Sequence, residues 1–167
     1  MATRRRDIER VAFAAGDISP VTAWMDRLAA AADGWINVLP QVGDNDEKQT
    51  RLGFVAMFGG GNPGVTMFTW IPGRANRRRP VPARLGIAHI TFGRAVATLR
   101  SHGVDVPQGW TVKGDHPRRG LVLELPPGVP SGQVVAWALR AVEVLTPPLP
   151  IRGWVADVHL PVDPRSA

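Results

Sequence analysis

The fold is decided by residues 84–161, which read RLGIAHITFGRAVATLRSHGVDVPQGWTVKGDHPRRGLVLELPPGVPSGQVVAWALRAVEVLTPPLPIRGWVADVHLP. Short apolar runs alternate in this stretch with apolar stripes at helical spacing, in the order strand, helix, strand, strand, helix, strand. That β-α-β-β-α-β order is the split βαβ of ferredoxin-like sheets. The sequence therefore predicts an α+β fold whose C-terminal half is a ferredoxin-like βαββαβ unit.

The elements of this unit have recognisable signals. Ser131 is typical of a helix cap, and the second helix is expected to begin there. The apolar stripe Phe92, Val96 and Leu99 turns one side of the first helix to the sheet, and we expect both helices on the same face. The expected strands are Leu85–Ile90, Trp110–Lys113, Leu121–Leu125 and Trp154–Leu160, and the expected helices are Phe92–His102 and Gln133–Leu145.

The chain before this unit supplies two further helices and three strands. Apolar residues at spacing i, i+3, i+4, i+7 predict a short helix over Arg5–Ala15. Ser19 and Pro20 form a helix start signal, with Ser19 as the cap, and Asp33-Gly34 marks the end of that helix. The expected strands are Trp35–Val42, Leu52–Phe58 and Val65–Ile71, the last two joined by a hairpin turn at Gly59–Gly64.

The whole chain, residues 1–167, is expected to be a single domain. Residues 17–71 offer one helix and three strands, and an Arg/Pro-rich loop at 72–83 connects them to the unit at 84–161. With 44% hydrophobic residues, a chain of 167 residues has enough apolar surface for one core. We expect one mostly antiparallel sheet of about seven strands, with three or four helices packed mainly on one face.

Two helix-to-strand segments resemble each other. Val21–Arg27 and Val134–Arg140 are identical at four of seven positions, and each leads into a Gly-Trp pair that opens a strand. Similar Ala-rich helices also arise by chance, and two copies are fewer than a repeat protein needs. The similarity predicts pseudo-symmetric packing of the two segments on one sheet.

Composition indicates the compartment and excludes some chemistry. The chain has no cysteine, so it has no disulfide, no thiol nucleophile and no Cys-based zinc site. No apolar run approaches the roughly 20 residues of a membrane span, and Asp7 and Glu9 stand where a signal peptide would be apolar. We therefore expect a soluble, cytoplasmic protein. Its 18 arginines and two lysines, with abundant Ala, Gly, Pro and Val, are typical of a bacterium with a GC-rich genome.

The positive charge is concentrated in one third of the chain. From Lys48 to Val104 there is no acidic residue and there are nine basic ones. The rest of the chain holds 11 basic and 14 acidic residues, so this segment accounts for all of the net charge of +6. Such asymmetry indicates an acidic partner.

Basic residues gather in two places that suit anions. Arginines crowd the loop after Trp70, and a second basic group forms the turn between two expected strands near residue 118. Arginine forks pair with phosphate oxygens, and tryptophan rings stack on bases. A solvated loop and a plain exposed turn are the competing interpretations. The candidate anion- or nucleic-acid-binding residues are Arg74, Arg77, Arg78, Arg79, Arg84, Trp70, His116, Arg118 and Arg119.

Motifs for catalysis or metal binding do not stand out. His89 and His159 lie in apolar strands, and Asp157 shares a face with His159, so an acid–base or metal pair is the alternative to structural roles. The acidic loop at 43–50 lacks the ligand spacing of an EF-hand, and the glycines at 59–64 lack the lysine of a P-loop. No Gly-x-Ser-x-Gly sequence occurs. We predict no catalytic residue, no metal ligand and no cofactor.

No residue pattern points to a characterised family, and three function classes stay open. The first is a non-catalytic binding or assembly module, which includes a homo-oligomer. The alternative is a phosphate- or nucleic-acid-binding protein that uses the basic loop and takes a polyanion as its partner. A small-molecule enzyme is third, because no nucleophile, metal motif or cofactor loop is evident. No feature indicates a membrane partner.

Overall fold

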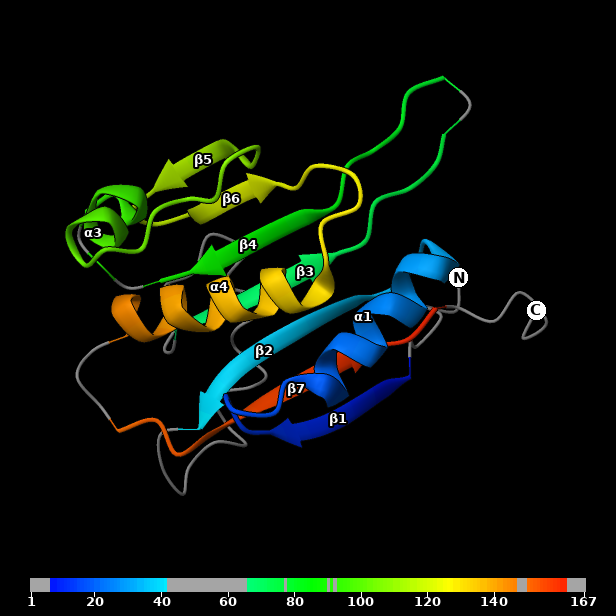
Figure 1. Cartoon of the computed structure of the whole chain (residues 1–167), viewed down its shortest axis with the longest axis horizontal. Coiled ribbons are helices and arrows are strands. Elements are labelled where there is room, and N and C mark those ends of the chain that lie inside the picture. The colour runs from blue at the N-terminus through cyan, green and yellow to red at the C-terminus, as the bar shows by residue number, and fades with distance from the viewer. Residues whose placement is uncertain are drawn as a thin grey trace, which may run out of the picture.

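The structure is a computed structural model, and it describes residues 7–41, 66–76, 78–89, 91, 93–146 and 150–161. Within these residues, seven strands form one sheet and three helices accompany it (Figure 1). The strands are β1 (Ile8–Phe13), β2 (Trp35–Gln41), β3 (Met67–Ile71), β4 (Arg84–Ala88), β5 (Thr111–His116), β6 (Gly120–Glu124) and β7 (Gly153–His159), and the helices are α1 (Ser19–Ala31), α3 (Ala95–Ser101) and α4 (Ser131–Leu145). Neighbouring strands are antiparallel throughout, in the order β1-β7-β2-β3-β4-β6-β5. The predicted α+β class with an antiparallel sheet is confirmed.

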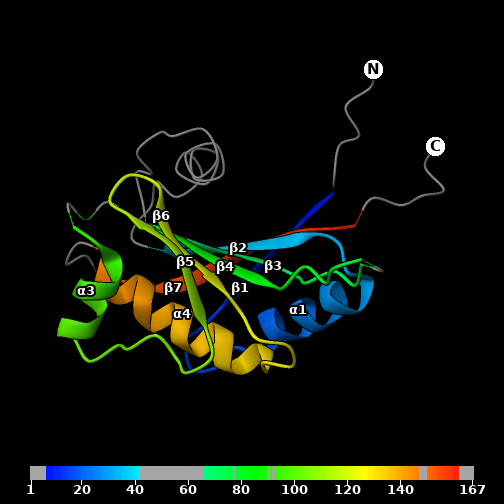
Figure 2. The same ribbon diagram turned by 90° about the horizontal axis from the view of Figure 1, so that it is seen from above.

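The three helices lie on one face of the sheet, as Figure 2 shows from above. α1 contacts β1 and β2, α3 contacts β5 and β6, and α4 contacts both of the other helices. The common face predicted for the helices over Phe92–His102 and Gln133–Leu145 is therefore confirmed. None of the described helices is long and apolar enough to cross a membrane.

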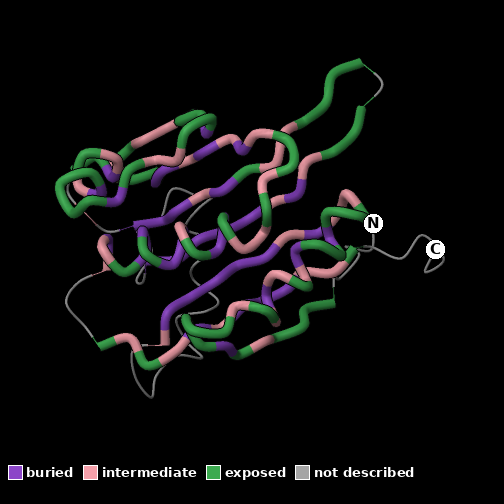
Figure 3. The backbone as a smooth tube through the Cα atoms, viewed as in Figure 1, coloured by how far each residue is buried: buried purple, intermediate pink, exposed green. Residues whose placement is uncertain are grey.

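The core fills the space between these helices and the sheet (Figure 3). Every second strand residue points into it, as Leu85 and Ile87 of β4 do, because side chains alternate between the two faces of a strand. α4 buries seven of its fifteen residues and is the central helix of the layer. The core therefore fixes which face of each strand remains for other contacts.

The first element differs from the prediction. Residues Ile8–Phe13 form strand β1 instead of the helix expected over Arg5–Ala15, and all six of them pair with β7. Ile8 is 58% exposed, whereas Val11 and Phe13, two residues apart, pack on the core. Pairing with β7 thus outweighs a weak local helix preference.

The strands of the C-terminal unit do not lie next to one another as one group. β4, β6 and β5 are neighbours, but β2 and β3 separate β7 from β4. The ferredoxin-like arrangement predicted for 84–161 is therefore not confirmed, although its six elements occur in the predicted order. The physical reason is that the preceding segment inserts two strands into the middle of the same sheet.

The two similar helix-to-strand segments lie side by side. β2 pairs antiparallel with β7 from Trp35↔His159 to Gln41↔Gly153, and α1 contacts α4 on the helix face. This arrangement agrees with the predicted pseudo-symmetric packing. The elements expected over Gly43–Thr50, Leu52–Phe58 and Gly59–Gly64 lie outside the described residues.

Candidate functional site: a pocket beneath the arginine loop

The chain between β3 and β4 leaves the sheet and returns to it as a projecting loop (Figure 1). Its two arms are joined by a pair of backbone hydrogen bonds: Arg74 N–H donates to Val81 O at 2.8 Å, and Val81 N–H donates to Arg74 O at 2.9 Å. A Cβ atom on Gly73 would lie 3.0 Å from both Ala83 N and Val81 O, so glycine permits this close approach. The segment predicted as a loop, residues 72–83, is therefore a loop whose two arms are hydrogen-bonded to each other near the sheet.

A pocket of about 780 Å³ lies at the base of this loop. Three segments far apart in the sequence form its walls: one side of α1, the loop itself, and the connection from β6 into α4. Five of the wall residues are prolines, whose rings fix the backbone φ angle. They are Pro80, Pro82, Pro126, Pro127 and Pro130.

Both signs of charge occur in the wall. Arg74 and Arg79 come from the loop, and Asp26 comes from α1. The Asp26 carboxylate accepts a hydrogen bond from the Ser131 hydroxyl, and Arg74 Nη2 lies 3.5 Å from Asp33 Oδ1. Arg79 forms no ion pair within the described part of the chain.

The remaining residues of the predicted basic loop have different positions. Trp70 also lines the pocket but is only 5% exposed, so a base can reach its ring only from inside the pocket. Arg78 is exposed and does not line the wall; its backbone N–H donates to Asn76 Oδ1. Arg77 lies outside the described residues. The role of these residues in anion binding stays a prediction.

The second basic group lies at the other end of β4. His116, Arg118 and Arg119 flank the β5–β6 turn, which adjoins Ala88, whereas the arginine loop joins β4 at Arg84. His116 Nδ1 accepts the Arg118 N–H at 3.1 Å, as in an ordinary turn. The turn between β5 and β6 and the loop at 72–83 therefore lie at opposite ends of β4.

Arg119 and Arg84 do line one small pocket, on the sheet face opposite the helices. Its volume is about 200 Å³, and Thr69, Gly86 and Val122 contribute to the wall. Arg84 Nη2 already donates to Glu124 Oε1 at 3.0 Å, and Lys113 Nζ lies 3.6 Å from the other oxygen of that carboxylate. One of the two arginines is therefore held by a carboxylate neighbour.

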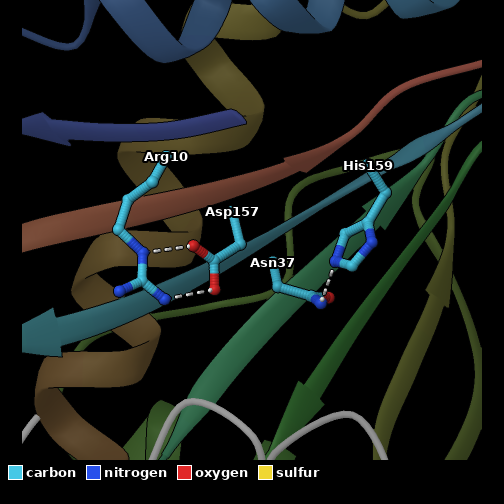
Figure 4. A network of polar contacts seen from close by, with 4 residues as sticks. All are labelled: Arg10, Asn37, Asp157 and His159. Carbon is cyan, nitrogen blue, oxygen red and sulfur yellow. Dashed lines mark hydrogen bonds and ion pairs between the residues drawn. The ribbon is translucent and has the colours of Figure 1, made fainter. Parts of the chain in front are cut away.

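A polar network on the same face includes Asp157 and His159 (Figure 4). Arg10 donates to both oxygens of Asp157, at 2.8 and 3.3 Å. The Asn37 amide lies 3.2 Å from His159 Nε2, and its carbonyl oxygen accepts the Thr69 hydroxyl at 2.7 Å. The carboxylate thus contacts an arginine, and the imidazole contacts an amide, so the two do not form a pair.

His89 is in a different place, on the helix side of the sheet. It is 1% exposed, and its Nδ1 lies 2.6 Å from Thr91 Oγ1. Burial lowers the pKa of this imidazole, and the nearby Asp115 carboxylate raises it by a smaller amount. Asp115 itself accepts the backbone N–H groups of Ala95 and Val96 at the start of α3. His89 and His159 therefore do not converge on one site.

Several pocket residues were not predicted from the sequence. Ser131 was expected to cap α4, but it is the first helical residue, and its hydroxyl binds Asp26 from α1. Ser19 likewise does not cap α1. Its backbone N–H and its hydroxyl both donate to Asp17 Oδ1. These hydrogen bonds lower the pKa of the Asp17 carboxyl. The proline cluster at 126–130 was a visible signal of a rigid turn, but its position opposite the arginine loop depends on packing of α1 against α4.

Comparisons with known proteins give no further guidance to this site. No protein-family model, no curated protein and no solved structure matches the chain. Among the described residues there is no group of three or more metal-ligating side chains.

Proposed function

We propose that the chain is a non-catalytic binding module, and that its ligand enters the pocket beneath the arginine loop. The observation that carries this proposal is a concave space of about 780 Å³ walled by α1, the 72–83 loop and the β6–α4 connection. Small-molecule sites are typically concave, mostly apolar and roughly 300–1,000 Å³ in volume.

The build of the walls supports binding without prior rearrangement. Five prolines and the hydrogen-bonded pair Arg74–Val81 restrict the backbone on two sides of the pocket. A site that is ordered before the ligand arrives avoids part of the entropy cost of binding. The described walls include no histidine, and the hydroxyl of Ser131 is held by the Asp26 carboxylate in a contact between α1 and α4. These features favour binding over chemistry.

A blocking substitution tests the proposal. Ala29 lies on the pocket side of α1, and Ala23 is exposed on the same helix outside the wall. Ala29→Trp should fill the pocket, whereas Ala23→Trp adds the same ring elsewhere. In a thermal-shift screen of small organic molecules, ligands should raise the Tm of the unmodified chain and of Ala23→Trp, but not of Ala29→Trp. Equal shifts in both variants would place the binding outside the pocket and reject the proposal.

A second candidate is binding of phosphate or nucleic acid by the basic loop. The observation in its favour is that Arg78 and Arg79 are exposed on a segment that projects from the molecule (Figure 1). Titration of labelled single- and double-stranded oligonucleotides at roughly 50 and 200 mM salt would test it, because phosphate contacts weaken steeply over that range. Binding should weaken with salt, and the double substitution Arg78→Ala, Arg79→Ala should flatten the salt dependence. Absence of binding at the lower salt concentration would reject this candidate.

A further inference from the structure

We infer that the ligand of this pocket is an organic anion: a carboxylate or phosphate monoester head group on an apolar body. This inference rests on the proposed function and adds the chemical class of the ligand. It follows from the separation of charge and apolar surface within one wall. The head group would lie at the loop side of the pocket, and the body would lie against the helices and the prolines.

The loop side of the pocket carries the available positive charge. Arg79 forms no ion pair among the described residues, and its guanidinium belongs to an exposed residue. Arg74 has only the 3.5 Å contact to Asp33, with its own side chain 55% exposed. Exposed pairs of this kind contribute little to stability because water screens them. Arg74 can therefore turn to an oxyanion with little loss, and two arginine forks suit a carboxylate or phosphate well.

The acidic group of the wall does not cancel this preference. Asp26 projects from α1, and its carboxylate accepts the hydroxyl of Ser131 from α4. With two arginines and one aspartate, the described wall has an excess of one positive charge. The excess belongs to the loop, so the electrostatic attraction for an anion is directed to that side of the pocket.

The rest of the wall excludes a ligand made only of charged groups. Met25, Trp70, Leu125 and Val134 are buried core residues that also border the pocket, and the proline rings extend this apolar surface. An apolar body placed there is stabilised because its surface is removed from water. Inorganic phosphate would use the arginines alone, and a neutral apolar molecule would use the apolar wall alone. An anion with an apolar body uses both.

Isothermal titration calorimetry with matched probes tests the ligand class. The probes are 2-naphthoate, its neutral amide 2-naphthamide, 1-naphthyl phosphate and inorganic phosphate. At least one naphthyl anion should bind about tenfold or more tightly than 2-naphthamide, a factor equal to about 1.4 kcal/mol and expected for a charge-assisted hydrogen bond. Inorganic phosphate should bind more weakly than 1-naphthyl phosphate. The tighter of the two anions identifies the head group.

Substitutions locate the interaction. Arg79→Ala should reduce the affinity for the naphthyl anion about tenfold and leave the affinity for 2-naphthamide unchanged. Arg140→Ala is the matched control, because Arg140 is an exposed arginine on α4 that does not line the pocket. Ala29→Trp should abolish binding of every naphthyl probe.

Each adverse result has a distinct meaning. Equal affinity for 2-naphthoate, 1-naphthyl phosphate and 2-naphthamide, all lost in Ala29→Trp, would overturn the anionic head group and leave the binding pocket in place. Inorganic phosphate binding as tightly as 1-naphthyl phosphate would overturn the apolar body. Full binding of the naphthyl probes to Ala29→Trp would overturn the proposed function itself.

Discussion

Two pairs of arginines, one on each side of the sheet, differ in what they contact. On the face opposite the helices, Arg10 and Arg84 lie 2.8 and 3.0 Å from the carboxylates of Asp157 and Glu124. On the helix side, Arg74 has a 3.5 Å contact and Arg79 has no ion pair within the described residues. Charges that are held by carboxylates contribute to structure, whereas charges left at the edge of an apolar pocket are available to a ligand. The same residue type therefore has two expected roles in this chain.

The largest expected effect concerns the polar network. Asn37 is buried and bridges Thr69 and His159, so Asn37→Ala removes one hydrogen bond from each of these two residues. A hydrogen bond contributes about 0.5–1.5 kcal/mol net to stability. The free energy of unfolding, measured by urea denaturation, should therefore fall by about 1–3 kcal/mol. The control is Asn76→Ala, which removes one hydrogen bond on the exposed loop and should cost about 0.5 kcal/mol or less. If both variants lost the same stability, the network would have no special structural role.

A smaller effect is expected from His89, because burial lowers the pKa of its imidazole in the folded chain. Below the usual histidine pKa of about 6.5, the unfolded chain binds a proton at this residue and the folded chain does not. Stability should therefore fall as the pH drops below about 6.5, with a slope of at most about 1.4 kcal/mol per pH unit, until the lowered pKa is reached. Urea denaturation at several pH values should show a weaker pH dependence in His89→Gln. An unchanged pH dependence would mean that His89 is not responsible.

Elements with their own local pattern could be predicted from the sequence, and elements defined by their neighbours could not. α4 carries a continuous apolar stripe, and β2 and β6 are apolar runs with clear ends, so each was expected near its observed position. β1 has a pattern that fits helix and strand alike, and only its pairing with β7 decides between them. The position of β7 beside β2 is likewise a property of the whole sheet.

The candidate site could be predicted only in part, because some of its residues come together only in the folded chain. The arginine loop was visible as a run of like charges without acidic neighbours in the sequence. The carboxylates near the arginines could not be predicted. Asp33 approaches Arg74, and Glu124 approaches Arg84, only in the folded chain. The apolar wall at 125–134 also depends on the fold, since α4 must pack beside α1 on the same face of the sheet before its N-terminal end can face the loop.

The smallest effect on stability is expected at the pocket edge. Arg79→Ala removes an exposed side chain without an ion pair among the described residues, so the free energy of unfolding should change by about 0.5 kcal/mol or less. The same variant should lose affinity for a naphthyl anion. Urea denaturation and calorimetry on one protein sample measure both quantities. A large loss of stability would show that Arg79 is a structural residue like Arg10, and the contrast between the two sides of the sheet would disappear.

The most direct test of the account is an NMR titration of the ¹⁵N-labelled chain with 2-naphthoate and 1-naphthyl phosphate. Backbone amide shifts report which of the two regions a ligand touches. The account predicts that the shifts concentrate on the loop at 73–83, the connection at 125–134 and the α1 residues near Ala29, and that the indole of Trp70 also shifts. Shifts centred on Arg10, Asp157 and His159, with none in the loop, would contradict it.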